Sequence, residues 1–108
     1  MRPKESDWKA FRKMIPVARE RFLAEKNQEL ARMLQNEGAE ASERFWSTFK
    51  EMKETAAELR HALDGHTRSK MYLKTYAMLR IGILREGDLD AFSPELKARL
   101  LQSLKDLD

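Results

Sequence analysis

The sequence predicts an all-α fold, a compact bundle of four main helices plus a short N-terminal helix, with mostly antiparallel neighbours. Three observations indicate this class. Only four Gly and three Pro interrupt 108 residues, and 36% of the residues are charged, as in long amphipathic helices. Apolar residues recur at spacings of three and four throughout the chain. They make up 42% of it, enough for one core, so residues 1–108 are expected to form a single helical domain.

The first helix is predicted to be short and to follow a flexible segment, residues 1–6. Ser6 or Asp7 can cap its N-terminus. One face of this helix carries the apolar side chains Trp8, Phe11 and Ile15. Pro16 cannot donate an amide proton and disfavours helical geometry in the residue before it, so a break or sharp kink is expected between Met14 and Pro16.

The second helix is expected over residues 16–36, because proline suits the first turn of a helix and apolar residues follow on one broad side. These residues are Phe22, Leu23, Leu30, Met33 and Leu34. Gly38 is the expected left-handed residue at its end. Lys26 lies near the middle of the apolar side, so it either extends its stem along that side or pairs with a carboxylate.

The third helix, residues 39–63, has the most regular pattern in the chain. A seam at alternating steps of four and three is formed by Phe45, Phe49, Met52, Ala56, Leu59 and Leu63. Such a seam is typical of coiled coils and helical bundles. Away from it lies an acidic side made of Glu43, Glu51, Glu54 and Glu58. Gly65 is expected to end the helix in the left-handed conformation.

The fourth helix, residues 67–85, is apolar on nearly all sides, which is typical of a central helix or of a subunit contact. A homodimer is therefore one expectation. Gly82 has no side chain and would let another helix approach closely. The fifth helix is expected from Pro94, with Ser93 as its cap, to about residue 107. Its predicted buried stripe is Leu96, Leu100, Leu104 and Leu107.

The segment 67–85 also carries the largest charge asymmetry, with basic residues and no acidic one. The candidate binding surface consists of Arg68, Lys70, Lys74 and Arg85. It could bind nucleic-acid phosphates or an acidic protein, but neutralisation by the glutamates of residues 39–63 is the favoured interpretation. A helix-turn-helix is disfavoured because charged and imidazole side chains surround Gly65 where that motif needs small or apolar ones.

Two arrangements of ionisable residues are candidates for chemistry. Glu58 and His61 have the Glu-x-x-His spacing of di-iron bundles, and Glu29 of a dimer could add a carboxylate. The pair lies opposite the seam, so a metal centre is only a remote alternative. His61 lies near His66 at a helix end, but the helix dipole already explains a histidine there.

Composition excludes several classes of protein. The chain has no cysteine, so it has no disulfide, thiolate metal site or thiol nucleophile. It shows no signal peptide or membrane span, and a cytoplasmic protein is expected. A net charge of +3 reflects cancellation of 21 positive by 18 negative groups rather than a nucleic-acid signature. No phosphate-binding loop or nucleophile elbow is present.

The leading functional hypothesis is therefore a non-catalytic interaction or regulatory module without a cofactor, which binds a protein partner or self-associates. A nucleic-acid-associated protein that uses the basic fourth helix is the alternative.

Overall fold

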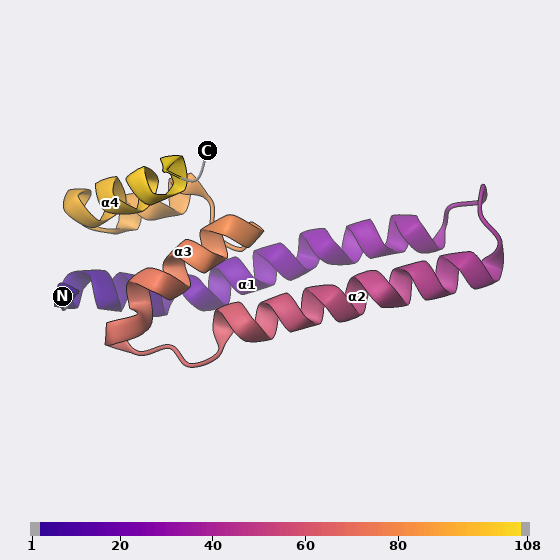
Figure 1. The fold of residues 1–108 in the computed structure, drawn as a ribbon, viewed down its shortest axis with the longest axis horizontal. Coiled ribbons are helices and arrows are strands. Elements are labelled where there is room, and N and C mark those ends of the chain that lie inside the picture. The colour runs from indigo at the N-terminus through magenta and orange to yellow at the C-terminus, as the bar shows by residue number, and fades with distance from the viewer. Residues whose placement is uncertain (1–2, 107–108) are drawn as a thin grey trace.

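The computed structural model describes residues 3–106 and confirms the all-α class, with no strand among them. Its elements in chain order are α1 (Glu5–Leu34), α2 (Ala41–Leu63), the 3-10 helix η1 (Arg68–Lys70), α3 (Met71–Ile81), the 3-10 helix η2 (Glu86–Ala91) and α4 (Pro94–Lys105). Helices α1 and α2 form a long antiparallel hairpin, and α3 and α4 pack at the end of the hairpin that holds the N-terminus (Figure 1).

Helix α1 runs without interruption through Pro16, so the predicted break and separate N-terminal helix are wrong. Pro16 lies on the exposed side of α1, where water can bind the Arg12 carbonyl that the missing amide would otherwise have bonded. On the opposite side Phe11, Ile15 and Ala18 are all buried, so one apolar face crosses the proline position. Burial of this face outweighs the local cost of the proline.

Asp7 joins the start of α1 to the start of α4. The prediction that it caps α1 is wrong. Helix α1 begins after Lys4, without a side-chain cap. The Asp7 side chain is 3% exposed and accepts hydrogen bonds from the Ser93 amide at 2.6 Å and the Ser93 hydroxyl at 2.7 Å. The Ser93 hydroxyl oxygen also accepts from the amide of Leu96 at 3.4 Å, which confirms Ser93 as the cap of α4.

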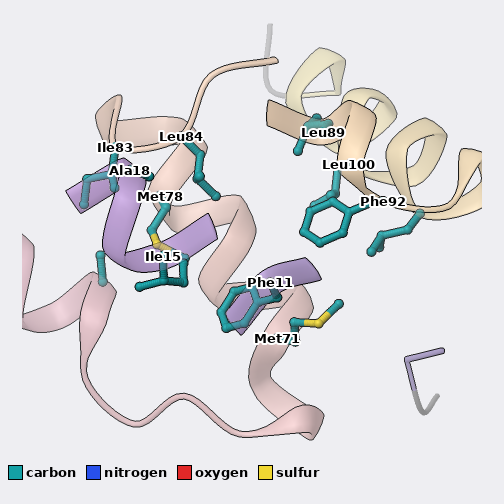
Figure 2. Close-up of a cluster of buried hydrophobic side chains, with 12 residues drawn as sticks. Phe11, Ile15, Ala18, Met71, Met78, Ile83, Leu84, Leu89, Phe92 and Leu100 are labelled. Atoms are coloured by element: carbon teal, nitrogen blue, oxygen red, sulfur yellow. The ribbon is translucent and has the colours of Figure 1, made fainter. Parts of the chain in front are cut away.

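The hydrophobic core lies where α1, the end of α2, α3 and α4 meet. Figure 2 shows Phe11 and Ile15 of α1 together with Met71 and Met78 of α3 and Leu100 of α4. The other buried members are Ala18, Ala62, Ile83, Leu84, Leu89, Phe92 and Leu96. The predicted α4 stripe is confirmed at its first two positions and half-buried at Leu104, whereas Leu107 lies outside the described residues.

Two glycines end helices with a positive φ. Gly65, at φ 71°, follows α2 as predicted. Gly82, at φ 89°, ends α3 at Ile81, so the fourth helix is shorter than predicted. A Cβ on Gly82 would meet no atom within 4 Å, so its role is backbone conformation and not close helix approach. Gly38 has no positive φ, and α1 ends earlier with Gln35 as its cap residue.

The far half of the α1–α2 hairpin projects from the core as an arm, defined here as residues 19–58 (Figure 1). Only Leu30, Thr48 and Thr55 are buried within it. Because the arm projects from the core, the molecule is elongated and measures 52 × 27 × 18 Å. Its radius of gyration is 16.6 Å, against about 13 Å for a near-spherical domain of this length.

Candidate functional site

The apolar seam of α2 does not face α1 in the arm. The side of α2 that faces α1 carries the buried residues Thr48, Thr55 and Ala62. The predicted seam is displaced from this line by one residue, about 100° around the helix. As a result Phe45, Phe49 and Met52 are 56%, 50% and 52% exposed. The expectation that the whole seam packs inside a bundle is wrong in the arm.

The seam is covered only near the core. Leu59 and Leu63, its last two residues, are partly buried and pack against the hydrophobic core. Towards the tip of the arm the same line of α2 continues uncovered. One end of this heptad-spaced apolar line is thus covered by the protein's own core, and the other end is exposed to solvent. This is the geometry expected of a helix that lacks a packing partner over part of its length.

Trp46 enlarges the uncovered part of the seam and was missed by the sequence pattern, because it lies one residue outside the four-three spacing. Its side chain is 62% exposed. Its ring centroid lies 4.9 Å from Phe45 and 6.0 Å from Phe49, with both ring pairs nearly perpendicular at 88°. We call Phe45, Trp46, Phe49 and Met52 the aromatic seam.

The α1–α2 contact inside the arm combines the buried Leu30 with polar pairs. Lys26 Nζ lies 2.8 Å from Glu51 Oε1 and 3.2 Å from Glu29 Oε2, which confirms the carboxylate pairing of Lys26. The hydrogen bond to Glu51 raises the pKa of Lys26, against a smaller opposing effect of burial. Glu51 therefore faces α1 and is not part of an acidic outer side. Thr48 Oγ1 is buried with no hydrogen-bond partner among the described residues.

The four residues of the predicted basic surface are separated, and three have partners. Arg68 pairs with Glu5 at 3.0 Å and lies over the Trp8 ring. Lys74 Nζ donates to the His61 carbonyl at the end of α2, at 2.7 Å. Lys70 is exposed at the start of α3 and is the one whose side chain has no partner among the described residues. Arg85 lies beyond the end of that helix and pairs with a carboxylate of α1.

Arg85 forms an ion pair with Glu25 of α1. Together with the Arg68–Glu5 pair, this shows that the neutralising carboxylates come from α1. The expectation that they come from the glutamates of residues 39–63 is wrong. Arg85 and Lys70 also do not share one helix, because Gly82 ends α3 between them.

The ionisable residues singled out for chemistry do not converge. Glu58 and His61 are both exposed on α2, and Glu29 is engaged by Lys26. His66 lies with Nε2 2.9 Å from the Ala62 carbonyl and meets the edge of the Phe11 ring. Among residues 3–106 no group of three or more acidic or histidine side chains could hold a metal ion.

A hollow of about 510 Å³ lies along the first half of α1. Met14 and Val17 contribute apolar surface to it, and Lys9 lines it as well. At one side Arg21 Nη2 donates to Asp88 Oδ2 at 2.6 Å. This hydrogen bond, with the Arg85 backbone amide, lowers the pKa of Asp88 despite partial burial.

Comparison with protein-family models gives no match to this chain, and comparison with curated proteins and with solved structures gives none either. Within the described part of the chain, no helix has the length and apolarity needed to cross a membrane.

Proposed function

We propose that this protein is a non-catalytic interaction module that binds another helix, from a protein partner or from a second copy, through the aromatic seam of its arm. The single observation that carries this proposal is a heptad-spaced set of large apolar side chains, each at least half exposed, on a helix that faces its own neighbour with threonines.

Burial of these exposed apolar side chains by another helix is energetically favourable. Burial of a large apolar side chain contributes about 1.5–3 kcal/mol, and aromatic residues dominate the energetics of protein interfaces. Helix α1 cannot supply this burial, because Lys26 and Glu51 occupy the contact between the two helices. A helix from outside the hairpin can lie along the seam with its side chains between those of Phe45, Phe49 and Met52.

A nucleic-acid-binding surface on residues 68–85 has weaker support. Arg68 and Arg85 already pair with carboxylates of α1, and Lys74 binds a backbone carbonyl. Phosphates would have to compete with these contacts, so little basic surface on α3 is available for them.

The proposal is tested by cross-linking from the seam in cells that express the chain. A photoreactive phenylalanine analogue replaces Trp46 in one version and Leu73 in another. Leu73 is a matched control, because it is 67% exposed on α3 and far from the seam in sequence. Covalent adducts with a polypeptide from position 46 and not from position 73 support the seam as the binding surface. An absence of adducts from position 46 refutes it.

A further inference from the structure

We infer that the helix which covers the aromatic seam comes from a second copy of this chain, in antiparallel orientation, so that two arms form one four-helix bundle. This inference rests on the proposed function and adds the identity of the partner. Two observations carry it: the exposed area and the symmetry of the seam.

The exposed area matches what a dimer would bury. The chain exposes 7604 Å². A folded monomer of 12.7 kDa is expected to expose about 6,200 Å². This excess of roughly 1,400 Å² per chain is more than the 800 Å² or so that each partner buries in a specific interface.

The aromatic seam itself accounts for a large part of the required area. Aromatic side chains bury about 150–250 Å² each when covered, so four half-exposed side chains offer on the order of 400 Å² per copy. Leu34, half exposed where α1 ends, adds to this. The seams of two copies thus supply about 800 Å², less than the 1,200 Å² or so of a typical specific interface, so the dimer is expected to be weak and to exchange with monomer.

The seam is self-complementary about a twofold axis at Phe49. In an antiparallel pair with this axis, Phe49 meets its own copy, and Trp46 lies level with Met52 of the other chain. Gly38, at the tip of one arm, lies level with residue 60 of the other chain. The overlap therefore ends close to where the core begins to cover Leu59, and the two arms fit along their full length.

The test is the mass of the purified full chain by sedimentation equilibrium from about 1 μM to about 1 mM, a range that spans weak to moderate affinities. Wild type and Leu73→Glu are expected to approach the mass of two chains as concentration rises. Phe49→Glu is expected to keep the mass of one chain throughout. Far-UV circular dichroism shows that both variants remain helical. A wild-type mass of one chain at every concentration overturns the inference.

The two proposals fail in distinguishable ways. A monomeric chain whose position 46 still cross-links to a different polypeptide refutes the second copy and keeps the seam as a binding surface. A monomeric chain with no adducts from position 46 refutes both.

Discussion

Asp7 is expected to be the most important single polar residue for the stability of the fold. It lies in the first turn of α1 and binds Ser93, 86 residues later, through both carboxylate oxygens. Replacement by alanine removes both hydrogen bonds and leaves the Ser93 amide, which is partly buried, without its acceptor. The connection between α1 and the start of α4 would then rest on apolar contacts and on the exposed ion pair between Lys4 and Glu95.

The size of the effect follows from the two bonds. A hydrogen bond to a charged group contributes about 1.5–3 kcal/mol to stability, and water can replace part of what the partly buried Ser93 loses. Asp7→Ala is therefore expected to lower the free energy of unfolding by about 2–4 kcal/mol. With a urea dependence of about 2 kcal/mol per molar, the unfolding midpoint falls by about 1–2 M.

The assay is urea unfolding followed by circular dichroism, with Asp90→Ala as the matched control. Asp90 is an exposed aspartate whose ion pair with Lys97 lies at the surface. Such pairs contribute about 0–1 kcal/mol, so the control midpoint should move by less than about 0.5 M. Equal shifts for the two variants would refute the structural role assigned to Asp7.

Three further predictions concern the same core and the arm. Because Arg21 lowers the pKa of Asp88, this carboxylate stabilises the fold above its ordinary value near 3.8 and loses that contribution as pH falls through the lower folded value. Urea midpoints measured between about pH 2 and pH 5 should therefore fall on acidification, and Asp88→Asn should flatten the profile; an unchanged profile would contradict the assignment. Gly82→Ala should destabilise by about 1 kcal/mol or more because of its positive φ, while Gly87→Ala should be neutral or slightly stabilising, and thermal unfolding compares the two. Thr48→Val removes a buried hydroxyl without a partner and should stabilise the chain by about 1 kcal/mol in the same assay; a loss of stability would show that the hydroxyl is bonded.

Local sequence chemistry was sufficient to predict several elements. The bounds of α2 and the start of α4 at Ser93 and Pro94 follow from periodicity and capping, which act within a few residues. The course of α1 through Pro16 did not follow, because the cost of a proline is local whereas the burial of Phe11 and Ile15 depends on helices that come much later in the chain.

The candidate site shows the same division. The periodicity of α2 identified an apolar seam correctly, but it could not say which neighbour the seam faces. That choice depends on α1, where Lys26 pairs with Glu51 and thereby turns the polar side of α2 inward. The partner of Arg85 could not be predicted from local sequence either, since Glu25 precedes it by 60 residues.

The central claim, that the aromatic seams of two arms meet in antiparallel orientation, is tested most directly by distances between spin labels on paired chains. The chain has no cysteine, so single cysteines at Ser47 and Glu40 take one label each. Both positions are exposed on α2 or at its N-cap. Along the helix axis the two labels of a dimer are expected to be about 6 Å apart for Ser47 and about 27 Å apart for Glu40. A clearly longer distance for Glu40 is the predicted result. Equal distances at the two positions, or no dipolar coupling at high concentration, would contradict the claim.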